Sequence, residues 1–345
     1  MTTPQKSRSK RGLATLSEAE LLASRLSDLD LDLDASDLGP LRDQLHRDLA
    51  ARGLSFRPRC YLSTEWFVEQ GETAIAMPFW LAHPRLVRLE RRMVIDVEGG
   101  TADAAMRILR HEAGHAADYA YGLVRAKGRG ELFGRSSTPY PDHYTPRPHS
   151  HSFVRHLDNW YAQSHPDEDF AETFAVLLTP ADWRTRYRTW KGALKKLEWM
   201  DALFQRLTKK EPVLRESFTH SIETDTRTLA EFYAARLQEL AEENSPEYVD
   251  GDLRRIFAAR ARHPGAEAAA DFIRRHRSKL RETIAHWSGL KKYNVDRMLS
   301  AMIATSRELE LVRTVAEESA LMELGAAGVA LSKNYLFAGR FSMSS

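Results

Sequence analysis

The segment HEAGH, from His111 to His115, constrains the fold of this chain more than any other. Apolar residues around it recur at helical spacing, so we predict a helix from Thr101 to about Leu123. Positions i and i+4 of a helix share one face, and both imidazoles can therefore reach one ion. Glu112 projects beside them, where a carboxylate can take a proton from a metal-activated water. The segment predicts a helix with two metal ligands and a general base, although a chain with 13 histidines forms HExxH by chance in roughly a few per cent of cases.

Two histidines need a third protein ligand if a water molecule is to take the fourth position on zinc. A histidine six residues beyond His115 would serve, but Tyr121 stands there. Cys60 is the only cysteine, which excludes a cysteine-based zinc site and an intramolecular disulfide. The third ligand must therefore come from a carboxylate or from another histidine elsewhere in the chain.

Glu168 and Glu172 form a second pair at i and i+4 spacing, and Pro166 before them suits the first turn of a helix. One carboxylate can bind the ion, and the other can accept a ring N–H from a ligand histidine. The alternative is a solvated acidic helix start, which the helix dipole also favours. In a chain that also contains HExxH, the metal interpretation is the better of the two.

These two segments resemble the two signatures of a family of bacterial zinc-binding metallopeptidases, which are gluzincin-like HExxH zincins. HEAGH matches the first signature, and YAQSHPDEDFAE from Tyr161 to Glu172 is similar to the second. Lethal-factor-type metalloproteases share this layout, and the resemblance covers about residues 58–200. It implies the following roles: one zinc ion bound by His111, His115 and Glu168, a general base in Glu112, a supporting carboxylate in Glu172, and an oxyanion donor in Tyr161.

The role of Tyr161 also has a chemical basis of its own. A phenol O–H aimed at a developing oxyanion is worth roughly a few kcal/mol of transition-state stabilisation. The alternative is an ordinary half-buried tyrosine beside Trp160.

The expected fold class is α+β: a zincin-like catalytic domain with a small mixed or antiparallel sheet and an active-site helix, followed by a mostly α-helical C-terminal region. A capping-box spacing at Ser17 predicts a first helix. Beyond Asn244 the pattern is entirely helical. Short runs of strand character are the only β-structure, and we predict strands at Arg59–Leu62, Thr73–Met77, Leu86–Leu89 and Arg92–Ile95.

A length of 345 residues predicts more than one domain. We expect a disordered basic tail over residues 1–14 and a zincin-like metallopeptidase domain over 15–240, with its core at about 58–200. An α-helical C-terminal domain over 245–345 completes the chain.

Several other features have competing interpretations. The strand at Thr73–Met77 is either an edge that pairs with an extended peptide or an interior strand. The loop at 127–152 is long enough to wall a cleft or to act as a lid. Asp118 either supports a ligand or is an exposed helix charge, the interpretation we favour. Additional histidines are expected to be polar loop or surface residues rather than extra ligands: His143, His149, His151, His156 and His165.

The net charge of +2 indicates no polyanionic partner. Residues 251–300 contain an excess of Lys and Arg, which we interpret as solvated helix faces, so nucleic acid is not an expected partner. No secretory signal precedes the first domain, and no apolar run reaches the ~20 residues that cross a bilayer. We expect a cytoplasmic protein that does not bind membranes; the sequence indicates no oligomeric state.

These features together predict a zinc-dependent hydrolase, a metallopeptidase that acts on a peptide or protein substrate. Two alternatives remain at this point. The same site suits hydrolysis of a non-peptide amide, and the chain also suits a non-catalytic helical scaffold that binds proteins and retains a zincin fold. Retention of Glu112 argues against the scaffold, because a structural zinc site has no use for a base.

Overall fold

A computed structural model describes residues 12–141, 144–242 and 250–338. The protein is mostly helical, with two small β pairings, and so belongs broadly to the α+β class. Of the predicted basic tail, residues 1–11 lie outside the described residues, and a short 3-10 helix at Leu13–Thr15 begins the described chain.

The chain divides into two compact units, each made of separate segments. The first unit contains Met1–Met93, Val97–Leu123 and Phe204–Glu239. The second unit contains Val94–Asp96, Val124–Leu203 and Leu240–Ser345.

The sheet of the first unit is a parallel pair. β1 (Cys60–Ser63) runs beside β2 (Ile75–Pro78), with Cys60 opposite Ile75. All of β2 is buried, as its continuous apolar character requires of a strand covered on both faces. A single antiparallel bridge joins Phe67 to Ala76 on the far side of β2. The first two predicted strands are therefore confirmed, and the sheet is mixed only through this one bridge.

The other two predicted strands are wrong, because the chain forms α3 (Pro84–Val94) there. Proline at the first helical position is preorganised for a helix. Leu86, Leu89 and Val94 are buried at helical spacing, whereas short windows of the same segment imitate strand alternation. Ile95 then adopts a left-handed conformation (φ 68°), which ends the helix.

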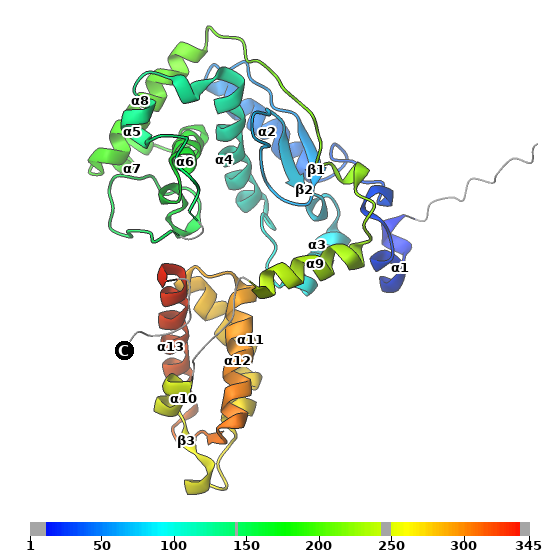
Figure 1. The fold of residues 1–345 in the computed structure, drawn as a ribbon, viewed down its shortest axis with the longest axis vertical. Helices are drawn as coiled ribbons and strands as arrows, with labels where there is room; N and C mark the ends of the chain where they lie inside the picture. Colours follow the sequence, from blue (N-terminus) through cyan, green and yellow to red (C-terminus); the bar gives the residue numbers. More distant parts are fainter. Residues whose placement is uncertain (1–11, 142–143, 243–249, 339–345) are drawn as a thin grey trace, which may run out of the picture. The chain divides into compact units, whose positions relative to one another are not determined.

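α4 (Ala102–Tyr121) confirms the predicted helix around HEAGH. The Thr101 side chain caps its start by accepting a hydrogen bond from the backbone of Ala104, and Gly122 ends it in the left-handed conformation (φ 64°). Within the first unit, α4 lies beside β2 and α2 (Leu38–Ala51) (Figure 1). Its small buried alanines allow this close approach.

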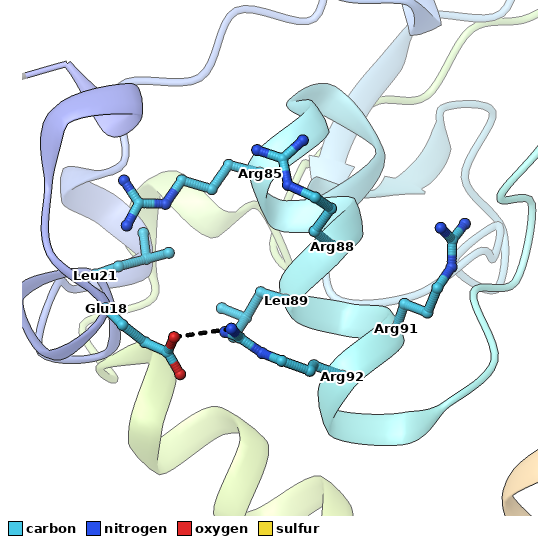
Figure 2. A pocket seen from close by; sticks show the side chains of 7 residues that line it. All are labelled: Glu18, Leu21, Arg85, Arg88, Leu89, Arg91 and Arg92. Atoms are coloured by element: carbon cyan, nitrogen blue, oxygen red, sulfur yellow. Dashed lines mark hydrogen bonds and ion pairs between the residues drawn. The ribbon is translucent and has the colours of Figure 1, made fainter.

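α1 (Glu18–Leu22) begins with the capping box predicted at Ser17. Between α1 and α3 lies a pocket of about 450 Å³ with a leucine floor. Figure 2 shows its wall of arginine side chains from α3, with Glu18 reaching across to Arg92 at 2.8 Å. The same unit also contains α9 (Leu229–Glu242).

The second unit begins with α5 (Arg129–Phe133), a 3-10 segment η5 (Asp158–Gln163) and α6 (Pro166–Leu178). α7 (Trp183–Tyr187) and α8 (Lys191–Leu207) follow. α6 begins as predicted, with proline in its first turn, and the imidazole of His165 is its N-cap. Phe170 on α6 packs edge-on against Phe133 of α5, with ring centroids 5.6 Å apart.

The C-terminal part of the second unit is a helical bundle with an apolar core. It contains α10 (Asp250–Ile256), α11 (Ala269–Ser288), α12 (Lys292–Glu308) and α13 (Glu317–Ala338). α11, α12 and α13 lie side by side, coloured yellow to red in Figure 1. The bundle is not wholly helical as predicted, because β3 (Ala258–Ala259) and β4 (Leu311–Val312) pair as a two-residue antiparallel ribbon. Across the described ranges, no helix combines the length and the apolar character that crossing a membrane requires.

Candidate metal centre

α4 places the two histidines of HEAGH on one face, as its periodicity predicts. Their Nε2 atoms lie 3.2 Å apart, and their rings meet edge to face at 74°. His111 is 3% exposed and Glu112 is 8% exposed, while His115 is partly exposed. Buried polar side chains in the middle of a helix cost free energy unless they find partners, so His111 and Glu112 require polar partners within the fold.

Glu168 on α6 completes a group of three donors with His111 and His115. Their ligand atoms all lie within 4.8 Å of one another. Two donors on a tetrahedral zinc ion, each ~2.0–2.2 Å from it, lie ~3.3–3.5 Å apart. The imidazole pair, at 3.2 Å, is close to this separation, and no pair of the three donors is more than 4.8 Å apart. The donor set therefore fits a zinc ion, and the predicted ligands lie together.

The first turn of α6 is acidic, but it is not the solvated helix start that the sequence left open. Glu168 is 5% exposed and Asp169 is 1% exposed. Asp167 accepts hydrogen bonds from buried Arg129 at 2.7 Å and from Ser136 at 2.6 Å. Asp167 thus has partners of its own, and so do Glu168 and Asp169.

The partner of Asp169 is Lys196 on α8, with 2.5 Å between carboxylate and ammonium. Burial raises the pKa of Asp169 to about 7, against the opposing effect of Lys196. Glu172 nearby also raises this pKa. A buried pair of this kind stabilises the protein only while both partners remain, because a lone buried charge costs several kcal/mol. Neither Arg129 nor Lys196 was identified from the sequence, since no local pattern connects them to α6.

Glu172 is fully buried, and its Oε2 accepts backbone N–H groups from Leu157 at 2.8 Å and His156 at 3.3 Å. These bonds tie α6 to the chain just before η5. The predicted support of a ligand histidine by Glu172 stays a prediction.

Tyr140, which lies in the loop predicted to wall a cleft or act as a lid, contacts the candidate ligand directly, and the sequence did not predict this contact. Its hydroxyl donates to Oε1 of Glu168 at 2.8 Å. Desolvation of its hydroxyl, which is partly buried although the residue as a whole is exposed, raises the pKa of Tyr140 above its ordinary value of 10.0, and the charge of Glu168 adds to this, so the phenol keeps its proton. Tyr161 is a further, smaller cause of the same shift. Tyr140 and Glu168 are 28 residues apart in the sequence, so their contact is seen only in the folded chain.

Tyr161 lies in η5, directly after two residues in the left-handed conformation. Asn159 has φ 56° and Trp160 has φ 54°. Such backbone costs roughly 1–3 kcal/mol per residue and is concentrated at functional sites. The Tyr144 hydroxyl donates to the carbonyl of Asn159 at 3.0 Å, which helps to hold this turn. The predicted oxyanion role of Tyr161 stays a prediction.

The additional histidines divide into two kinds. His149 and His151 are exposed, and the His151 ring stacks on Trp190. His156 and His165 are buried, so a surface position is wrong for these two. Both ring nitrogens of His165 are engaged: Nδ1 accepts from the Asp167 backbone at 3.1 Å, and Nε2 contacts the Thr138 carbonyl at 2.7 Å. His143 lies outside the described residues. Within the described ranges, none of these histidines belongs to the group of metal donors.

Two other interpretations can now be decided, and the ion pairs of the basic segment can be described. Asp118 is 8% exposed, so it is buried rather than an exposed helix charge. β2 is an interior strand along its centre, because the Ile75 N–H donates to Arg59 and the Ala76 N–H donates to Phe67. The basic C-terminal segment forms ion pairs on its own surface, such as Arg275 with Glu267 at 2.8 Å and Lys292 with Glu282 at 2.6 Å.

Comparisons with known proteins add no relatives. No protein-family model matches the chain, and no curated protein or solved structure is significantly similar to it.

Proposed function

We propose that this protein is a zinc-dependent hydrolase, a metallopeptidase that cleaves an amide bond with Glu112 as general base. One observation carries the proposal: His111, His115 and Glu168 bring their donor atoms within 4.8 Å of one another. Two imidazoles and one carboxylate are the ligand set of hydrolytic zinc sites, in which water takes the fourth position.

A zinc ion bound there would supply a Lewis acid that lowers the pKa of a water molecule towards ~7 and polarises a carbonyl. Glu112 follows His111 on α4 and is 8% exposed, so its carboxylate is largely shielded from bulk water. It would take the proton from the attacking water and deliver it to the leaving nitrogen. Tyr161 would donate its phenol proton in a hydrogen bond to the developing oxyanion.

The zincin-like catalytic domain and the peptide nature of the substrate rest on the resemblance of the two motifs. The charge arrangement supports the metal itself. Glu168 is almost fully buried, and an ionised carboxylate loses its hydration at a cost of several kcal/mol. The hydrogen bond from Tyr140 offsets part of this cost, and a divalent cation between Glu168 and the two histidines would offset more of it.

The test is metal analysis of the purified full chain together with Glu112→Gln. We expect about one zinc ion per chain in both proteins. Hydrolysis of a broad peptide library by the variant should fall by roughly 10²- to 10⁴-fold, because the base is lost while the ligands remain. The matched control is Glu198→Gln on the exposed side of α8, which should leave both readouts unchanged.

Different results would point to different conclusions. A wild-type chain without zinc, or a Glu112→Gln variant as active as wild type, would overturn the proposal. Zinc binding with cleavage of small amides but not of peptides would favour the non-peptide hydrolase. Zinc binding without any hydrolysis in either protein would favour the non-catalytic scaffold.

A further inference from the structure

Tyr140 meets the candidate ligand Glu168 in an arrangement that is more than a chance surface contact. Its hydroxyl lies 2.8 Å from Oε1 of Glu168, although the residue as a whole is 58% exposed. The ring stacks face to face on the imidazole of His165, with centroids 3.7 Å apart and planes inclined by 12°. An exposed tyrosine with both its ring and its hydroxyl fixed has lost conformational freedom, which needs compensation.

The imidazole under Tyr140 is itself held at both ring nitrogens. A backbone N–H only donates, so Nδ1 of His165 must accept from Asp167. A carbonyl only accepts, so Nε2 must donate to Thr138, two residues before Tyr140. The ring is therefore a neutral imidazole with its proton on Nε2. It joins the start of α6 to the loop that contains Tyr140 and gives the phenol a fixed platform.

A carboxylate has two oxygens, and a monodentate metal ligand uses only one of them. When a donor holds the other oxygen, it fixes the rotation of the group and aims the free oxygen. Partners of this kind to ligands typically contribute 10- to 100-fold in metal affinity. Tyr140 suits this task because its hydroxyl can donate to Glu168, whereas another carboxylate would repel it.

We propose that Tyr140 is a positioning residue for the metal centre: its hydroxyl holds one oxygen of Glu168 so that the other faces the ion, and His165 is the platform that holds Tyr140. This inference rests on the proposed function, since it concerns the same ion. The loop before α6 would then contribute to metal binding, in addition to any role in covering a cleft.

The test is the zinc dissociation constant of the full chain, measured by competition with a chromophoric chelator. Tyr140→Phe removes only the hydroxyl and should weaken zinc binding by about 10-fold or more, with the stoichiometry and the metal-free melting temperature unchanged. The control is Tyr144→Phe, the same change in the same loop, whose hydroxyl bonds to the Asn159 backbone instead. It should bind zinc as wild type does.

A double-mutant cycle tests the platform. His165→Ala should also weaken zinc binding, and adding Tyr140→Phe to it should change the affinity little further, because both changes remove the same restraint. Additive losses would overturn the role of His165. Zinc affinity in Tyr140→Phe equal to that of wild type would overturn the role of Tyr140, whereas a wild-type chain that binds no zinc would overturn the proposed function itself.

Discussion

α6 is buried along almost its whole length and α11 along one face, and the two helices bury opposite kinds of side chain. α6 buries Glu168, Asp169, Glu172 and Thr173 among its apolar residues. α11 buries an almost purely apolar face, including Phe272, Leu280 and Ile284. Burial of apolar surface stabilises a fold by itself, at about 25 cal/mol per Å². Burial of carboxylates does so only through specific partners, and α6 has a different partner for each of them.

This difference supports the proposed metal-binding role of α6 and assigns α11 a role in stability. A chain gains nothing in stability from buried carboxylates that hydrophobic residues of similar size would not supply. The acidic residues of α6 therefore call for a functional explanation, whereas those of the C-terminal bundle lie on its surface in ion pairs.

The largest expected effect is a difference in zinc binding between substitutions of two carboxylates of α6. Glu168→Ala removes a proposed ligand and should abolish tight zinc binding. Glu172→Ala removes a carboxylate that holds the Leu157 and His156 backbone and should weaken binding by only about 10- to 100-fold. Isothermal titration with zinc measures both. The reverse ranking would exchange the roles of the two residues.

The next effect concerns the buried pair of Asp169 and Lys196. Lys196→Met leaves the carboxylate without its cation and should cost about 3–5 kcal/mol of unfolding free energy at ~pH 8. Burial raises the pKa of Asp169 to about 7 from an ordinary 3.8, and removing Lys196 raises it further. A group whose pKa is raised by folding contributes stability at low pH and loses it as the pH rises through that window.

The loss should therefore be much smaller at ~pH 5, where Asp169 is protonated in the folded variant. Urea unfolding at the two pH values measures this difference. The control is Lys195→Met, an exposed neighbour on the same helix. Equal losses at both pH values would show that the pair contributes by packing rather than by charge.

The smallest effect on zinc binding is expected from a substitution in α11. Leu280→Ala should lower the unfolding free energy by about 2–5 kcal/mol, because it leaves a cavity in the C-terminal core. Its zinc stoichiometry and affinity should stay at wild-type values. Chemical denaturation and zinc titration of the same sample test both halves. Weaker zinc binding in this variant would show that the packing of α11 affects the proposed metal centre.

Local patterns made much of this site predictable. HEAGH lies on a helix because its apolar neighbours repeat at helical spacing and Thr101 caps the start. Pro166 marked the beginning of α6 for an equally local reason. The strands predicted after Pro84 failed because short windows of α3 fit both periodicities, and only packing of the whole helix decides between them.

The partners of the acidic turn could not be predicted, because they come from distant parts of the chain. Tyr140 precedes Glu168 by 28 residues, and Lys196 follows Asp169 by 27. A hydroxyl, an ammonium and a carboxylate at such separations have no periodic signature. Only folding brings them together, and burial distinguishes Glu168, Asp169 and Lys196 from the many exposed residues of the same types.

The hydrogen bonds at both nitrogens of His165 bear on which metals the proposed centre would accept. With that ring committed to Asp167 and Thr138, it cannot join His111, His115 and Glu168 as a further ligand. A centre with these three donors from the described residues, two of them imidazoles, would suit ions that accept four-coordinate geometry and nitrogen ligands, as zinc does. It would disfavour magnesium and calcium, which demand six or more oxygen ligands. A histidine that binds no metal would thus contribute to the selectivity of the proposed centre by being unavailable.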